Sequence, residues 1–157
     1  MKNAILFTIL IFLAALPACR KEDNSPAPAD EQTWTYADTT FKAVFAEINT
    51  RYGYQITFRP GGAAGLDYGI TLRLVEKPED GRSYLVSKDT TVASQVKVIL
   101  ETGTTPAYSS IGGDGKRVSV GIKEGKLSYT GDDIRLVRDT IPALADTLIL
   151  RFKLTEY

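Results

Sequence analysis

Hydrophobic and polar residues alternate along most of this chain after residue 33. Alternation with a period of two places apolar side chains on one face of a β-strand and polar side chains on the other. Six segments follow this rule. Their apolar positions are Tyr52, Tyr54, Ile56 and Phe58; Ile70, Leu72 and Leu74; Val96, Val98 and Leu100; Val118, Val120 and Ile122; Ile134 and Leu136; and Leu148, Leu150, Phe152 and Leu154. The pattern predicts a half-buried sheet.

Turn signals separate these segments. Pro and Gly favour a turn at residues 59–62, Asp-Gly favours a tight turn at 80–81, and the Gly-Gly-Asp-Gly run at 112–115 predicts a loop. Glu124-Gly125 is the clearest hairpin signal. A two-residue loop there would place Ile122 opposite Leu127, so that apolar residues meet on one face.

The stretch from Phe41 to Gly53 has a different pattern. Its apolar residues Phe41, Val44, Phe45, Ile48 and Tyr52 have helical spacing, and Gly53 would suit the end of a helix. The β-branched and aromatic residues among them favour a strand instead. These residues alone favour a helix slightly.

The N-terminus has the pattern of a secretory signal. One positive charge at Lys2 precedes the apolar run Ala4 to Ala15, which is too short to span a bilayer as a helix. The following residues, Leu16-Pro17-Ala18-Cys19, resemble the lipobox of bacterial lipoproteins. The resemblance implies cleavage between Ala18 and Cys19 and a lipid on the Cys19 thiol. The alternative is ordinary signal cleavage that leaves a free thiol.

Residues 20–33 contain no large apolar side chain and include two prolines, so we expect a disordered tether. The expected organisation is a signal peptide at 1–18, a lipidated tether at 19–33 and one domain at 34–157. The run Lys21-Glu22-Asp23 resembles the charged export tag of Bacteroidota surface lipoproteins. A generic solvated linker explains it equally well, so either face of the outer membrane remains open.

Composition restricts the chemistry. The chain has 19 basic and 19 acidic residues, which gives no net charge to attract nucleic acid or anionic lipid. Its single cysteine leaves no internal disulfide. It has no histidine, the usual general base near pH 7 and the commonest zinc ligand.

Carboxylates are then the main catalytic candidates, and none forms a convincing pair. Asp132 and Asp133 are adjacent, so on a strand they would face opposite sides, and after Gly131 we expect them to cap a turn. Glu76, Glu79 and Asp80 are expected in a solvated loop. We therefore expect a non-catalytic domain with no cofactor and no metal site.

Binding is the better prospect. Tyr36, Tyr68 and Tyr108 lie in or beside predicted loops, where exposed aromatic rings commonly form recognition surfaces, for instance by stacking on sugar faces. The alternative is that these rings cover the ends of the core. Trp34 is expected to be the first core anchor.

Several motifs follow one another in an order that resembles small all-β lipoproteins of Bacteroidota with no assigned function. They are Trp34-Thr35-Tyr36 leading to Thr40-Phe41-Lys42-Ala43, Pro78 to Val86, Tyr108-Ser109-Ser110, Gly115 to Val120, Gly125 to Ser128, and Leu148 to Thr155. In that family the first segment is extended, which implies that residues 41–48 form a strand. The family's usual glycine before the Thr-Phe pair is replaced here by Asp38-Thr39.

The sequence thus predicts one all-β domain of about seven to ten antiparallel strands, a sandwich in preference to a closed barrel. The expected function is that of an outer-membrane lipoprotein that binds a glycan or a protein partner. A structural or assembly role in the envelope, without a soluble ligand, is the alternative.

Overall fold

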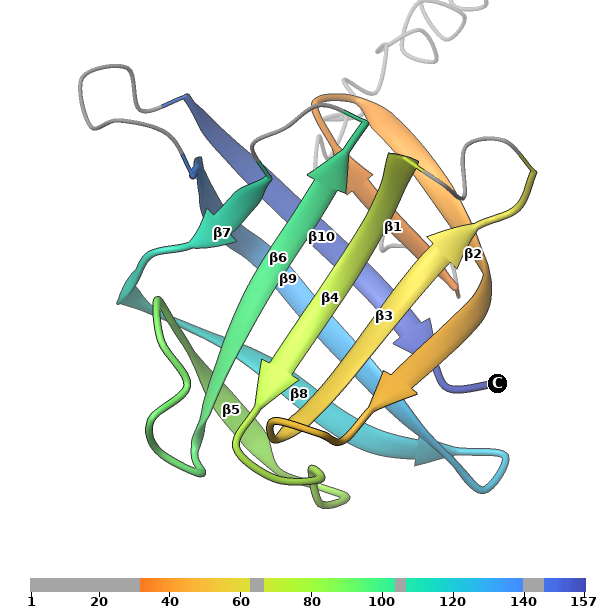
Figure 1. Cartoon of the computed structure of the whole chain (residues 1–157), viewed down its shortest axis with the longest axis vertical. Coiled ribbons are helices and arrows are strands. Elements are labelled where there is room, and N and C mark those ends of the chain that lie inside the picture. Colours follow the sequence, from red (N-terminus) through yellow and green to blue (C-terminus); the bar gives the residue numbers. More distant parts are fainter. Residues whose placement is uncertain (1–31, 63–66, 104–106, 140–145) are drawn as a thin grey trace, which may run out of the picture.

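The computed structural model describes residues 32–62, 67–103, 107–139 and 146–157, which form ten β-strands in one sheet (Figure 1). The predicted all-β class is confirmed. The strands are β1 (Thr33–Tyr36), β2 (Thr39–Asn49), β3 (Tyr54–Pro60), β4 (Tyr68–Leu74), β5 (Ser83–Ser87), β6 (Gln95–Thr102), β7 (Tyr108–Ser110), β8 (Gly112–Lys123), β9 (Lys126–Arg138) and β10 (Thr147–Thr155). Within the described ranges, no helix is long and apolar enough to cross a membrane.

The strands lie in the order β10-β1-β2-β3-β4-β6-β5-β8-β9-β7, with further pairings of β10 with β9 and of β6 with β7. Neighbours are antiparallel, as predicted, with the exception of β5 and β6, which pair in parallel through Leu85 and Val86. The connection between them returns to the end of the sheet where β5 began, so both strands run in the same direction. The sequence prediction missed this pair.

The alternating pattern is confirmed in the core. Side chains from all ten strands are buried in one hydrophobic cluster, among them Trp34, Ile56, Phe58, Leu72, Val98, Tyr129, Leu136 and Phe152. In Figure 1, β3, β4 and β6 cross in front of β9 and β10. The rings of Phe58 on β3 and Tyr129 on β9 meet edge to face, with 5.9 Å between their centroids. Trp34 is completely buried, as predicted.

Two residues assigned to the buried faces are exposed. Tyr52, at 87% exposure, lies in the turn between β2 and β3, and Ile122, at 57%, lies next to the tip of the β8–β9 hairpin. Both residues lie beyond the end of the core. Conversely, Thr57 and Thr71 are buried on the opposite face of β3 and β4, where their hydroxyls lie 2.9 Å apart and share a hydrogen bond.

The hairpin predicted at Glu124-Gly125 has the predicted register. Ile122 pairs with Leu127 and Val120 with Tyr129. Glu124 and Gly125 have φ angles of 52° and 78°, the positive values that a two-residue hairpin loop of this twist requires. Asp80-Gly81 also forms a turn, as predicted.

The stretch with helical spacing is strand β2, as the family resemblance implied. It pairs with β1 through Thr39 to Lys42 and with β3 from Ala43 to Asn49, with a bulge between Ala43 and Phe45. Hydrogen bonding to these neighbours outweighs the weak helical pattern. The apolar residues that follow the bulge are largely exposed.

Asp132 and Asp133 do not cap a turn, so this prediction was wrong. They lie inside β9 at a β-bulge, where both residues face Arg151 of β10, and Asp133 has a φ of 52°. Asp tolerates this left-handed conformation better than most residues, which explains why a bulge was mistaken for a turn.

The Gly112–Gly115 run is likewise not a separate loop. It forms the irregular start of β8, and Gly112, Gly113 and Gly115 have φ angles between 69° and 85°. Gly112 pairs with Ser87 of β5, which keeps this glycine-rich stretch in the sheet.

Candidate functional site

Aromatic rings gather at one end of the sheet, beside the turn that joins β1 to β2. Phe41 on β2 stacks with Trp34, Tyr36 and Tyr68, at centroid distances of 5.5, 5.6 and 4.9 Å. The planes of Tyr36 and Phe41 differ by only 4°. We call Tyr36, Phe41 and Tyr68 the aromatic cluster. The buried ring of Trp34 supports it by stacking on Phe41.

Local sequence explains why these rings meet. The turn residues Ala37 and Asp38 both have positive φ angles, as a two-residue hairpin requires, and they place Trp34 directly opposite Phe41. Asp38 therefore allows this tight turn without a glycine. Tyr68 is the first residue of β4, which begins at the same end of the sheet (Figure 1).

The three tyrosines proposed from the sequence lie near one another. The pKa of Tyr36 is raised above its ordinary value, chiefly by burial and further by the nearby hydroxyls of Tyr68 and Tyr108. Tyr36 and Tyr68 are half-buried, whereas Tyr108 is buried. Phe41 thus joins two of the predicted rings, Tyr36 and Tyr68, and both remain accessible to a ligand.

Tyr108 is held by the protein itself. Its hydroxyl donates a hydrogen bond of 2.6 Å to Asp146 and accepts one of 2.9 Å from Arg138, whose guanidinium also lies over the ring. Burial raises the pKa of Tyr108, and the hydrogen bond to Asp146 adds to this. Tyr108 therefore supports the end of the sheet and contributes little open surface. Arg138 and Asp146 carry no sequence signal that would have identified this role.

A hollow of about 200 Å³ lies beside the aromatic cluster. It is lined by Thr35, Tyr36, Ala37, Asp38, Ile149 and Arg151. Its walls offer a hydroxyl, a carboxylate and a guanidinium, and Thr35 and Arg151 are cross-strand partners on the face of β1 opposite to the ring of Tyr36. The hollow can therefore bind polar groups of a ligand by hydrogen bonding, whereas the aromatic cluster offers rings for stacking on the other face of β1.

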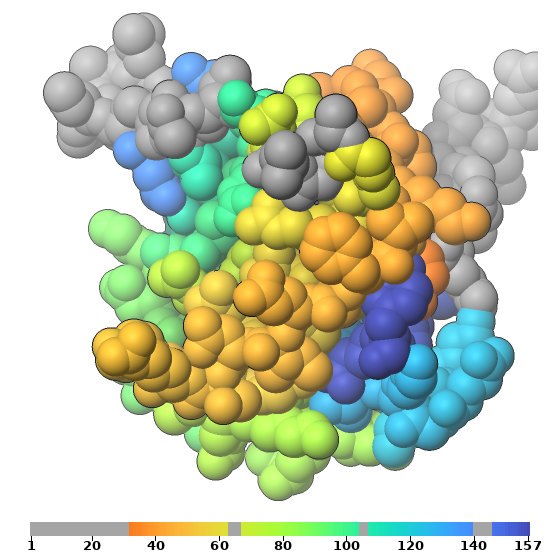
Figure 2. Space-filling model, turned by 45° about the vertical axis from the view of Figure 1, so that its right-hand side comes forward, coloured from red at the N-terminus to blue at the C-terminus, as the bar shows by residue number. Residues whose placement is uncertain are grey.

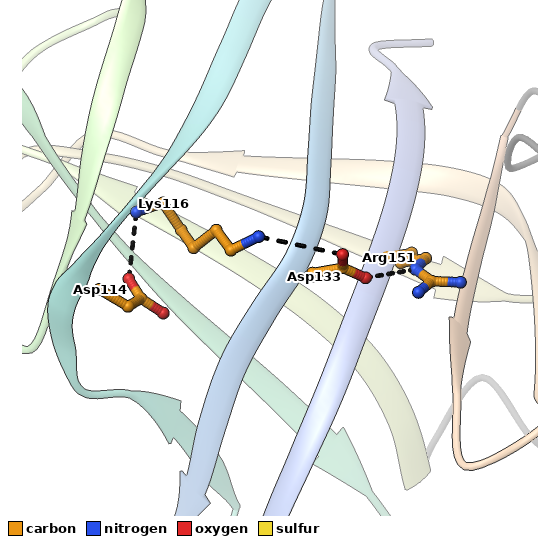
Figure 3. Close-up of polar contacts among 4 residues, drawn as sticks. All are labelled: Asp114, Lys116, Asp133 and Arg151. Carbon is orange, nitrogen blue, oxygen red and sulfur yellow. Dashed lines mark hydrogen bonds and ion pairs between the residues drawn. The ribbon is translucent and has the colours of Figure 1, made fainter. Parts of the chain in front are cut away.

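Arg151 is oriented by Asp133. Figure 3 shows the Asp133 carboxylate between Arg151, at 2.6 Å, and Lys116, at 3.9 Å, while Asp114 accepts a hydrogen bond from the backbone of Lys116. Asp133 and Asp114 thus both contact Lys116, Asp133 at its ammonium group and Asp114 at its backbone N–H. Within the described ranges no three His, Cys, Asp or Glu residues are grouped as metal ligands.

Among the other carboxylates considered from the sequence, Glu79 also has partners within the fold. Glu79 forms an exposed ion pair of 2.7 Å with Arg82, and its backbone N–H donates to the hydroxyl of Tyr84. These contacts stabilise the loop between β4 and β5.

A second polar group lies near the end of β10. The hydroxyls of Tyr54 and Tyr129 both donate to Oε1 of Glu156, the latter over 2.7 Å. Burial, together with the bond to Glu156, raises the pKa of Tyr54 to about 12, and burial raises that of Tyr129 still further. Both tyrosines therefore remain protonated donors over the physiological pH range.

The predicted lipidation site at Cys19 and the cleavage position after Ala18 lie outside the described residues. Comparisons of the chain with protein-family models, with curated protein sequences and with solved structures found no significant match.

Proposed function

We propose that this protein is a lipoprotein whose Cys19 is acylated and whose β-domain binds a glycan or protein partner at the outer membrane without transforming it. The lipobox-like run before Cys19 supports the anchor. The lack of histidine and the separately paired carboxylates support a binding role rather than catalysis. The periplasmic and the cell-surface face are both compatible with these features.

The proposed domain is a sandwich-like arrangement, with β3, β4 and β6 packed across β9 and β10. The contact between Phe58 and Tyr129 supports it. Such a scaffold would present its connecting turns, and the rings beside them, at a rigid end.

The aromatic cluster is the observation that carries the binding role. Tyr36 and Tyr68 are half-buried rings supported from behind by Phe41, so neither needs to be ordered when a ligand arrives. The apolar face of a sugar ring can stack on such a surface. A glycan is therefore the ligand class that this end fits best.

A glycan array probed with the full chain tests this proposal. Tyr36→Ala is expected to weaken binding of any glycan that scores by at least about tenfold, because stacking on an aromatic ring contributes about 1–3 kcal/mol. Tyr36→Phe should retain most of the affinity. Tyr52→Ala removes a fully accessible tyrosine far from the cluster and should leave binding unchanged.

Equal urea midpoints for these variants would show that folding is not the cause of the loss. Glycan binding that survives Tyr36→Ala and Tyr68→Ala together would exclude the aromatic cluster as the site. Protease treatment of intact cells separates the two membrane faces, because a domain on the cell surface is cleaved before the outer membrane is broken.

The alternative role in envelope assembly is favoured by a different observation. Strand β2 exposes Val44, Phe45 and Ile48 to solvent. Exposed apolar side chains grouped on one strand are typical of protein contacts rather than of a freely solvated surface.

A further inference from the structure

Strand β2 pairs with a different neighbour along each half of its length. Its first half pairs with β1, and that ladder ends where the Ala43 N–H donates to the carbonyl of Gln32. The second half pairs with β3 alone. Among the described residues, no strand lies along the other edge of residues 44–49, which we call the open edge.

The start of the open edge is closed by side chains. The Gln32 amide donates to the Thr155 carbonyl over 3.2 Å and accepts from the Thr155 N–H over 3.1 Å, as a neighbouring strand would. The Tyr157 hydroxyl donates to the Ala43 carbonyl over 2.5 Å. These contacts satisfy the end of β10 and the position before the open edge, but they do not extend along it.

Figure 2 shows the surface of β2 together with the end of β10 and the β8–β9 hairpin beside it. A hollow of about 320 Å³ in this region is lined by residues from Gln32, the β8–β9 hairpin and the end of the chain at Thr155 to Tyr157. This hollow beside the sheet is therefore accessible from solvent. Its walls are mainly polar and charged side chains.

The open edge has few of the features that usually prevent strand pairing. It contains no proline and no lysine, and Glu47 is its only charged residue. Its protection consists of that charge and the bulge at Val44. Val44, Phe45 and Ile48 are 49%, 44% and 48% exposed, so a chain laid along the edge would cover apolar side chains as well as backbone groups.

We propose that the open edge binds an extended segment of a partner protein as an added β-strand. An unpaired row of backbone N–H and C=O groups is matched by another polypeptide in extended conformation. Side-chain pockets then select the sequence of that polypeptide.

The pairing with β3 fixes which side chains the segment needs. Ile48 faces Ile56 of the core, whereas Phe45 and Glu47 face Arg59 and Thr57 on the opposite side. The incoming segment is therefore apolar on the face of Ile48 and carries a basic residue near Glu47. The surface lies apart from the aromatic cluster, so this binding is additional to the proposed glycan site.

A second copy of the chain fits this edge less well. Pairing two β2 strands antiparallel, with like faces aligned, places Glu47 opposite either Glu47 or Phe45 of the other copy in the two most central registers. Like charges directly opposite each other destabilise a strand pair. A basic segment of another protein meets the same edge without that cost.

A synthetic peptide with valine at alternate positions and lysine or threonine between them serves as the probe, with fluorescence anisotropy of a labelled peptide as the readout of binding to the full chain. We expect saturable binding and slower amide hydrogen exchange in residues 44–49. The same peptide with N-methyl groups on alternate amides keeps its side chains but loses backbone donors, and it should bind at least about tenfold more weakly.

Ile48→Lys should weaken peptide binding by a similar factor, because it places a positive charge where an apolar contact is needed. Val92→Lys is the matched control, since Val92 is 51% exposed but lies in the connection between β5 and β6. This control should bind as the unaltered chain does. An unchanged urea midpoint for Ile48→Lys confirms that the loss of binding is not unfolding.

Three results would overturn the proposal. The N-methylated peptide could bind as tightly as the unmodified one, which would exclude a backbone ladder. The chain alone could form a dimer in light scattering that Ile48→Lys disrupts, which would identify a second copy as the occupant. Amide hydrogen exchange in residues 44–49 could already be slow in the chain alone and become fast when residues 20–31 are deleted. That result would identify this segment of the chain as the occupant of the open edge.

Discussion

Gly131 on β9 tests how tightly the ring of its cross-strand neighbour, Phe152 of β10, is packed into the core. A Cβ atom added at this glycine would lie 2.5 Å from two ring carbons of Phe152, which is completely buried. Ordinary carbon contacts are about 3.5–4.0 Å. The alanine variant therefore requires a shift of the ring or the backbone of about 1 Å inside a closely packed interior.

Overpacking of this kind costs about 1–3 kcal/mol. For a domain of this size, that corresponds to a decrease in melting temperature of roughly 3–12 °C. Gly121→Ala is the control, because its added Cβ would make one ordinary contact of 3.4 Å with the Ser128 hydroxyl. At a strand position without a clash, Gly to Ala is expected to be neutral or to stabilise by up to about 1 kcal/mol.

Urea unfolding of the four variants Gly131→Ala, Phe152→Leu, the double variant and Gly121→Ala measures the effect. The smaller leucine should relieve the clash, so the double-mutant cycle should show a coupling of at least about 1 kcal/mol. Equal stability of Gly131→Ala and Gly121→Ala would refute the reasoning. A coupling near zero would show that the ring of Phe152 is not the obstacle.

Three further predictions concern single sites. Asp133→Ala should be less stable than Asp133→Gly by about 1 kcal/mol in urea unfolding. Both variants lose the ion pair with Arg151, but only glycine adopts the positive φ without strain. Equal stabilities would contradict this. Thr57→Val should cost about 1–2 kcal/mol by leaving the buried Thr71 hydroxyl without its partner, whereas Thr57→Val with Thr71→Val should be close to neutral; a double variant as unstable as the single one would contradict it. Since the pKa of Tyr54 is raised to about 12, the unfolded chain releases this proton first, so stability should fall as pH rises from about 10 towards 12. Tyr54→Phe should flatten that decrease, and an unchanged pH profile would show that Tyr54 does not contribute.

The sequence predicts this fold well wherever strands have one buried face. Residues 54–58, 70–74 and 96–100 follow a period of two, and the structure buries the expected side chains. The Glu124-Gly125 hairpin even has the predicted register, because a two-residue loop leaves little choice. Local chemistry determines these features.

Features that depend on distant neighbours were not predictable in the same way. Asp132 and Asp133 have the composition of a turn. They remain in a strand because β9 pairs with β10 both before and after the bulge. In β2, helical spacing competes with pairing to β1 and β3, and only the tertiary structure decides. The parallel pairing of β5 with β6 likewise has no local signal.

Only part of the candidate site was predicted from the sequence. Glycines and polar residues around Tyr36, Tyr68 and Tyr108 indicated rings near loops, but not that the three loops share one end of the sheet. Phe41, which joins the rings of the aromatic cluster, was identified only as part of an ambiguous apolar pattern. The open edge of β2 depends on where β1 begins, which a single sequence does not reveal.

Mass spectrometry of the protein isolated from its own cells tests the proposed membrane-tethered binding domain most directly. We predict that the mature chain begins at Cys19 and carries a thioether-linked diacylglycerol there, and that Cys19→Ala releases the protein from the membrane fraction. A chain with an unmodified thiol at residue 19, or a Cys19→Ala variant that still sediments with membranes, would contradict this.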